Sequence, residues 1–161
     1  MRLTTRTNLA LRTLMFCAVN DGALVRKQDA ARAINASENH LAQVINKLAQ
    51  EGFVTTLRGR HGGFHLGRAA SSISVGAVFR AFESSLPFIE CFSDNNTCPL
   101  KAHCVMRPHL SRAVEAFYSA LDELYLSDLV RCNAGLEALL SMEGPRIPKT
   151  CAGTADVVAA Q

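Results

Sequence analysis

Aromatic residues are scarce in this chain of 161 residues, which has no tryptophan, two tyrosines and eight phenylalanines. Hydrophobic residues still make up 48% of it, so we expect a globular protein with a mostly aliphatic core. Long apolar runs are absent as well, because none approaches the roughly 18 to 20 residues that a membrane-spanning helix requires. The composition therefore predicts a protein with no membrane partner.

Signals for secretion and for common enzyme chemistries are also missing. The first residues are polar and basic and lead into no apolar segment with a cleavage site, so we expect a cytoplasmic protein. No phosphate-binding glycine motif precedes a helix, and no Ser, His and Asp gather at a strand–turn–helix elbow. We therefore expect no enzyme. In the cytoplasm, the six cysteines should be thiols or metal ligands and not disulfides.

Charge is divided unevenly along the chain, although its overall balance is only +3. Residues 1–68 carry ten Lys and Arg against four Asp and Glu, a balance of +6. Residues 69–161 carry seven against ten, a balance of −3. The first part can therefore face a polyanion, whereas the second part must face something else.

Helical periodicity dominates the first fifty residues. Apolar side chains recur at helical spacing over residues 5–20, and a short alanine-rich helix fits residues 26–34. Ser37 is placed to cap a third helix, which carries apolar residues on one face and ends at Gly52. These features predict three consecutive helices.

The periodicity then changes to that of a β-hairpin. Residues 53–57 and 64–66 read as strands, and the turn between them, residues 58–63, is basic and rich in glycine. Residues 74–82 predict one more short helix. Three helices followed by a hairpin with a basic tip predict a winged helix-turn-helix fold, mainly α with a small β-hairpin.

A long helix is predicted in the second half. Residues 107–125 have apolar side chains at steps of three and four, and the length of this stretch suggests a partner. A last helix fits residues 129–140, with Ser127 and Asp128 at its cap. Four parts follow from this reading: the winged domain at 1–85, a cysteine segment at 86–105, dimerisation and C-terminal helices at 106–142, and a tail without periodicity at 143–161, which we expect to be disordered.

The third helix is the candidate recognition helix, because its outward face is polar near its start. Asn and Gln suit adenine, and Lys and Arg suit guanine or phosphates. An Arg on the wing can also enter the minor groove. The candidate DNA-binding residues are Asn39, His40, Gln43, Lys47, Arg58 and Arg60.

Cys91, Cys98 and Cys104 are the candidate metal ligands, spaced C-x6-C-x5-C among turn-forming residues. Structural zinc sites usually pair their cysteines more tightly, although His103 and His109 lie nearby. The wider spacing favours an iron–sulfur cluster on a pliable loop. Three thiolates leave one coordination position open, which is what a sensor of small molecules requires. The alternatives are a zinc-stabilised interaction module, unligated cysteines and, less favoured, a redox enzyme.

Several motifs together resemble the iron–sulfur winged-helix repressors of the NsrR, IscR and RirA type. The resemblance covers residues 1–142 approximately. Its motifs are Arg2-Leu3-Thr4, Asn39-His40-Leu41, Arg58-Gly59-Arg60-His61-Gly62-Gly63, Ile73-Ser74-Val75-Gly76, Cys98-Pro99-Leu100 and Ser127-Asp128-Leu129-Val130. The residues of the third helix are closest to the nitric-oxide-sensing branch. This resemblance implies a homodimer on double-stranded promoter DNA, with a [2Fe-2S] or [4Fe-4S] cluster whose destruction by nitric oxide relieves repression.

Two positions depart from the family pattern. Asn8 stands where some members of the nitric-oxide-sensing branch place an aspartate ligand, and Arg107 stands where the cluster-assembly branch has a histidine. The identity of the fourth ligand is therefore left open, and the candidates are Asn8, a water, His109 and Glu90. Asn8 also occurs in the iron-responsive branch, so an iron-responsive regulator is the alternative within the family.

Overall fold

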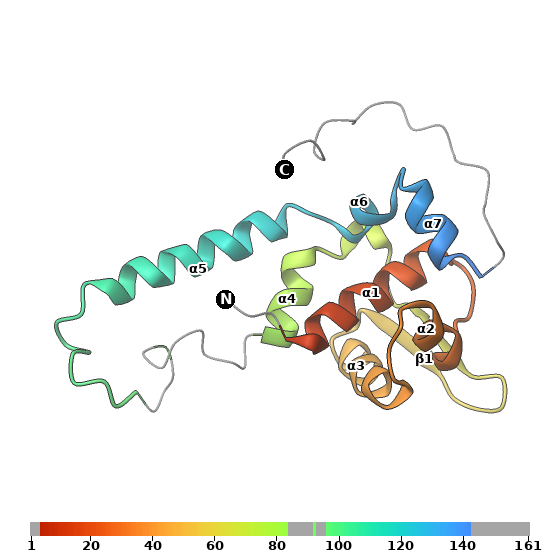
Figure 1. The fold of residues 1–161 in the computed structure, drawn as a ribbon, viewed down its shortest axis with the longest axis horizontal. Coiled ribbons are helices and arrows are strands. Elements are labelled where there is room, and N and C mark those ends of the chain that lie inside the picture. Colours follow the sequence, from red (N-terminus) through yellow and green to blue (C-terminus); the bar gives the residue numbers. More distant parts are fainter. Residues whose placement is uncertain (1–3, 84–91, 93–95, 143–161) are drawn as a thin grey trace.

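The computed structural model describes residues 4–83, 92 and 96–142. Within that part of the chain, the predicted fold class is confirmed: the elements are helical except for one two-stranded antiparallel sheet (Figure 1). In chain order they are α1 Thr5–Val19, α2 Lys27–Ala33, α3 Glu38–Gln50, β1 Val54–Leu57, β2 Gly63–Leu66, the 3₁₀ turn η1 Ala70–Ser72, α4 Val75–Glu83, α5 Met106–Asp122, α6 Leu126–Val130 and α7 Ala134–Leu140.

Helix α1 lies at the centre of the winged unit, which comprises α1 to α4 and the hairpin (Figure 1). It packs against α3, α4 and α6. The fully buried side chains are mostly aliphatic, as predicted, with Phe16 of α1 as the largest. Among the described helices, none has the length and apolar character needed to cross a membrane.

The third helix forms as its sequence predicts. The Ser37 hydroxyl accepts a hydrogen bond from the backbone N–H of His40 at 3.3 Å and so caps α3. Four apolar side chains face the core, and just beyond the helix the chain turns at Gly52 with φ of +70°, a conformation that glycine adopts without strain. The buried residues of α3 are Leu41, Val44, Ile45 and Leu48.

The hairpin pairs Val54 with Leu66 and Leu57 with Gly63. Phe64 of β2 also exchanges two backbone hydrogen bonds of 2.9 Å with Val25, in the link between α1 and α2. A side chain at Gly63 would clash with the backbone at Val25, so only glycine permits this close approach. The wing is thus attached directly to the helical part.

Helix α5 extends away from the winged unit (Figure 1), and none of its residues is buried. It begins at Met106 and ends at Asp122, close to the predicted bounds of 107–125. It ends earlier than predicted because Tyr125 forms a β-bridge with Ser74. The first half of α5 therefore has little of its own chain to pack against.

The predicted final helix at 129–140 is wrong as a single element. Two short helices occupy this region, and Ser127 and Asp128 lie inside α6 instead of before the helix. The break falls at Cys132, whose φ is +59°, and Asn133 then caps α7 by accepting a hydrogen bond from the backbone of Leu136 at 3.1 Å. Cys132 is also disulfide-bonded, which corrects the expectation that all six cysteines are thiols or ligands.

The predicted disordered tail, residues 143–161, lies outside the described residues, as do Cys91 and Glu90. The last described residues are held to α1 by Asn20, which is 2% exposed. Its side-chain amide donates to the carbonyl of Leu140 at 2.8 Å and accepts from the backbone N–H of Met142 at 2.9 Å. The C-terminal helices are therefore attached to the winged unit.

Candidate nucleic-acid interface and cysteine segment

The outer face of α3 carries the predicted recognition residues. Asn39, His40 and Gln43 are exposed, and Lys47 is half-buried, while the opposite face of the helix lies in the core. Lys47 forms an ion pair of 2.6 Å with Glu51 one turn later on the helix. The polar start of α3 is therefore more accessible than the part of this face around Lys47.

Two basic residues near α3 were missed by the sequence analysis. Arg6, in the first turn of α1, donates a hydrogen bond from Nη2 to Oε1 of Gln43 at 3.3 Å. Lys27, at the start of α2, forms an ion pair of 3.2 Å with Glu38. The positive balance of residues 1–68 pointed to this region, but no local pattern indicated which cations lie beside α3.

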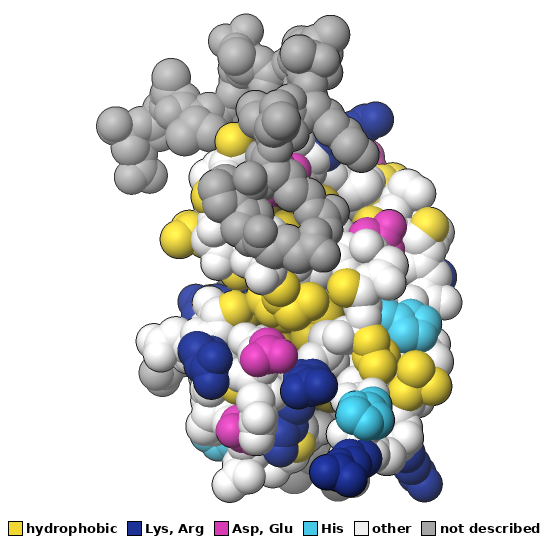
Figure 2. Space-filling view, turned by 90° about the vertical axis from the view of Figure 1, so that its right-hand side faces the viewer, with side chains coloured by type: hydrophobic (Ala, Val, Ile, Leu, Met, Phe, Trp, Pro, Cys, Tyr) yellow, Lys and Arg dark blue, Asp and Glu magenta, His cyan; other side chains and the backbone are white. Residues whose placement is uncertain are grey.

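The wing presents the other predicted DNA-binding residues. Arg58 and Arg60 are exposed at its tip, and neither forms an ion pair with any described residue. Between them, Gly59 has φ of +118°, which a residue with a side chain rarely adopts. Dark blue Lys and Arg side chains gather over the lower part of the face shown in Figure 2. This part of the molecule can face a polyanion.

A groove of about 290 Å³ separates α3 from the wing. Asn46 of α3, Lys27 of α2 and Gly59 and Gly62 of the wing are among its lining residues. Apolar residues, among them Ile45 and Leu57, make up much of the rest of the lining, while the lysine and the glycine backbone could contact a sugar–phosphate strand at its rim. The groove and the outer face of α3 together form the candidate nucleic-acid interface.

The cysteine segment, residues 86–105, links α4 to α5. Cys98 and Cys104 in it are half-buried free thiols. Two hydrogen bonds shape the backbone around Cys98. The Asn96 side chain accepts from the backbone N–H of Cys98 at 2.9 Å, and the Cys98 carbonyl accepts from the backbone N–H of Lys101 at 3.2 Å. Within the described residues, no three potential ligands gather into a metal site; Cys91, the third predicted ligand, lies outside them.

The donor chemistry of the described cysteines fits a soft metal centre. Cys98 and Cys104 are accessible enough to bind iron or zinc as thiolates. By contrast, Cys17 is a core residue that is 2% exposed, and its burial raises the pKa of the thiol to about 12. Of the histidines considered, His103 is exposed, and His109 contacts Nη2 of Arg112 through its Nδ1 at 3.1 Å.

Arg80 holds the C-terminal half of α5 to the winged unit. From α4, its guanidinium donates to Asp122 at 2.5 Å and to Glu115 at 3.4 Å, and it lies 4.8 Å from the ring centroid of Tyr118. The hydrogen bond to Asp122 is the main reason that the pKa of Arg80 is raised above its ordinary value. Gly76 leaves room for Asp122, since a side chain there would clash with it.

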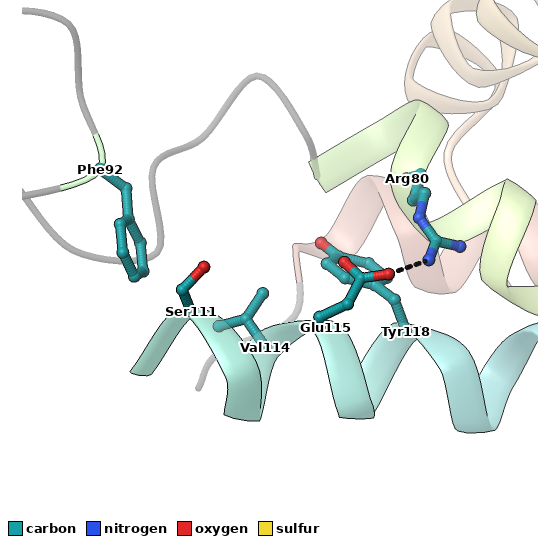
Figure 3. A pocket seen from close by; sticks show the side chains of 6 residues that line it. All are labelled: Arg80, Phe92, Ser111, Val114, Glu115 and Tyr118. Atoms are coloured by element: carbon teal, nitrogen blue, oxygen red, sulfur yellow. Dashed lines mark hydrogen bonds and ion pairs between the residues drawn. The ribbon is translucent and has the colours of Figure 1, made fainter. Parts of the chain in front are cut away.

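A mostly apolar hollow of about 290 Å³ opens next to this contact. Figure 3 shows Arg80 directed towards Glu115, with Ser111 and Val114 further along α5 and Phe92 of the cysteine segment across from them. The cysteine segment, α4 and α5 therefore meet at one place. A change in this segment can act on both helices that it joins.

Glu83, the last residue of α4, ties the end of this helix to the start of α1. Its Oε1 accepts hydrogen bonds of 2.9 Å from both the backbone N–H and the hydroxyl of Thr4, and a third from the hydroxyl of Thr7. Partial burial favours a higher pKa for this carboxyl, but the hydrogen bonds from Thr7 and Thr4 together outweigh it. The pKa of Glu83 is therefore lowered. Asn8, the candidate fourth ligand, is exposed in the next position of α1.

Comparisons with known proteins agree with this arrangement. The profile of the Rrf2 family, described as an iron-dependent transcriptional regulator, matches residues 3–132. Protein aau3 of Rhizobium meliloti (strain 1021) is 39% identical over 94% of this chain and 99% of its own length. The HTH-type transcriptional regulator NsrR of Geobacillus kaustophilus (strain HTA426) is 39% identical over 87% and 97%. The solved structure of T. potens IscR has a TM-score of 0.63 at 26% identity, covering 81% of this chain and 86% of that chain.

Proposed function

This chain belongs to the Rrf2 family of transcriptional regulators, and on that premise we propose that it is a promoter repressor controlled by a nitric-oxide-sensitive iron–sulfur cluster. One observation carries the proposal. The half-buried thiols of Cys98 and Cys104 lie in the segment that joins the winged unit to the unburied helix α5. Chemistry at these thiols would therefore act where the DNA-binding and dimerisation parts meet.

The winged unit would bind the promoter. Asn39, His40, Gln43 and Lys47 of α3 would enter the major groove, because they form the polar face of the capped helix. Arg58 and Arg60 on the wing would bind the adjacent backbone or minor groove. We assign these roles because no described acidic residue neutralises the wing arginines.

A homodimer would bury the face that α5 leaves open. Met106 is 64% exposed, and Leu110 and Val114 are only half-buried. A helix of 17 residues without a single buried side chain gains little stability from its own chain. Packing of this helix against its copy would place two recognition helices on successive turns of DNA.

Cys91, Cys98 and Cys104 would hold the cluster, with Asn8, His109, Glu90 or water at the fourth position. When bound, an iron–sulfur cluster with one weak ligand offers an iron that nitric oxide can attack. The role of this chain is to supply soft thiolates and to connect them to both helices. Glu83 fixes the end of α4 that precedes the segment in the chain, and α5 begins two residues after Cys104.

An iron-responsive regulator is the second candidate. The description of the matching family as iron-dependent favours it, and so does the neutral Asn8 at the fourth-ligand position. In that case, the binding and loss of iron would replace nitric oxide as the signal, with the same residues at the interface. A zinc-stabilised interaction module remains the alternative outside this class.

Purification without oxygen tests the cofactor. We expect brown wild-type protein containing iron and sulfide, and the same for Cys17→Ala, because Cys17 is a buried thiol with a raised pKa. Cys98→Ala should be colourless and should bind promoter DNA differently. Colourless wild-type protein containing one zinc would support the interaction module, and a brown Cys98→Ala protein with normal repression would contradict the ligand assignment.

A further inference from the structure

Gln43 does not stand alone on the recognition face. Its side-chain Oε1 accepts the hydrogen bond from Nη2 of Arg6 at 3.3 Å, and both side chains are exposed. The two residues lie 37 positions apart in the sequence and come together because α1 packs across α3 (Figure 1). A cation thus sits beside a residue proposed to read bases.

The first turn of α1, which carries Arg6, is fixed in place. Thr7 is fully buried, and it and Thr4 both bond to the Glu83 carboxylate. Thr4 also caps the helix by accepting the backbone N–H of Thr7 at 3.3 Å. Arg6 therefore extends from an ordered backbone, so that only its side-chain rotamers remain to be ordered when it holds a partner.

The chemistry of the contact decides which way the Gln43 amide points. A glutamine side chain can present either its carbonyl or its NH₂ group, but a guanidinium has only donors. Arg6 can therefore bond only to the carbonyl oxygen, which leaves the NH₂ group of Gln43 available as a donor.

We propose that Arg6 is a positioning residue that makes Gln43 a hydrogen-bond donor towards the major groove. This inference rests on the proposed DNA-binding function and specifies its base preference. Guanine presents two acceptors in the major groove, N7 and O6, whereas adenine presents an acceptor and a donor. Arg6 occupies one of the two lone pairs of the Gln43 carbonyl and places its own donors beside the other, so the pair presents mainly donors and favours guanine. Without Arg6, Gln43 regains the two-pronged pairing with adenine.

The test is a selection from a randomised DNA duplex library with the dimeric, full-length protein. Gln43→Ala identifies the base pair that Gln43 contacts, because its preference flattens there. Arg6→Ala should shift preference at that same pair from guanine towards adenine by about fivefold or more, and leave other positions unchanged. Arg6→Lys, which keeps a donor, should restore guanine.

Two further variants sharpen the result. Gln43→Glu keeps an acceptor for Arg6 but replaces the outward donor by an acceptor, so it should select bases that present a donor, adenine or cytosine. Arg131→Ala removes an equal charge from the exposed residue just after α6, away from α3, and should leave the base profile unchanged. Melting temperatures should match those of the wild type.

Three results would overturn the inference. If Arg6→Ala weakens binding equally on all sequences and lowers the salt dependence by about one counterion, Arg6 is a phosphate contact. If its base profile equals that of the wild type, Arg6 does not position Gln43. If the wild-type protein selects no sequence at all, the proposed DNA-binding function itself fails, which the first two results leave intact.

Discussion

Single side chains hold together parts of this molecule that are distant in sequence. Glu83 accepts hydrogen bonds from Thr4 and Thr7 across 79 and 76 positions, and Asn20 bonds to Leu140 across 120. Each joins the end of one helix to another element, where backbone groups have no partner within their own helix. The junctions of the fold therefore depend on a few polar residues.

Replacing Glu83 by Gln should destabilise the protein in a manner that depends on pH. The pKa of Glu83 is lowered in the folded state, so its contribution is complete above the ordinary glutamate pKa and is lost as the pH falls through the folded value. At pH 7 we expect a loss of about 1 to 2 kcal/mol in the free energy of unfolding, measured by urea denaturation.

The difference between the wild type and Glu83→Gln should shrink steadily as the pH falls below about 4.5, the ordinary value for this group. Glu123→Gln is the matched control, because Glu123 is exposed at the end of α5 and should cost little at any pH. An unfolding difference that is independent of pH would show that the charge of Glu83 does not stabilise the junction.

Arg58 is an exposed cation at the tip of the wing. Arg58→Ala should weaken promoter binding by about tenfold and reduce the slope of log K against log salt by about one, because an exposed wing cation is removed. Fluorescence anisotropy at several salt concentrations measures both quantities. Arg131→Ala provides the charge-matched control, and an unchanged affinity for Arg58→Ala would exclude the wing contact.

Local patterns made some of these residues predictable and not others. Ser37 as a cap and Leu41, Val44 and Leu48 as core residues follow from spacing within one helix. The pair of Arg6 and Gln43 does not, because no periodicity relates residues on two helices that meet only after folding. The candidate DNA-binding residues remain predictions, although the structure leaves most of them exposed.

At the scale of elements, α5 is the one described α-helix without a buried residue. Two residues of α4 hold its second half. Arg80 bonds to Asp122, and the ring centroid of Phe79 lies 5.9 Å from that of Phe117. Its first half extends beyond α4 (Figure 1). An element of this kind is stable when a second copy covers it.

A charge on the open half of α5 should therefore separate the subunits. Leu110→Glu places a carboxylate among apolar side chains that we expect to meet in the dimer, and unpaired buried charge is costly. We predict at least a tenfold rise in the dimer dissociation constant, measured by analytical ultracentrifugation. Ser119→Glu, on an exposed position of the second half, is the control, and a dimer that survives Leu110→Glu would place the interface elsewhere.

The bounds of some helices and strands could be predicted from the sequence, whereas others could not. The bounds of α3 and of the hairpin follow from a serine cap and from glycines, which act locally. The division between α6 and α7 depends on Cys132 with a positive φ, a conformation that a cysteine adopts only when its surroundings impose it. Cys132 itself carries no signal for this break, although Asn133, which follows it, is a residue type that often begins a helix.

For the whole molecule, the charge division read from the sequence corresponds to a division of labour. The winged unit carries the basic surface that we propose binds DNA, and the second half provides α5 and the cysteine segment. Arg80 of α4 connects the two through Asp122 and Glu115 of α5. The proposed control of DNA binding by the cysteines would need only a small shift at this connection, since the half-sites of a dimer are about one helical turn apart.

Titration of nitric oxide into anaerobic wild-type protein bound to promoter DNA tests most directly whether an iron–sulfur cluster controls promoter binding. Absorbance follows the cluster, and anisotropy follows the DNA in the same sample. We predict that the brown chromophore and the promoter affinity are lost together, and that Cys98→Ala protein does not respond. Promoter binding that stays constant while the chromophore disappears would contradict the account, and a response to iron removal alone would assign the signal to iron.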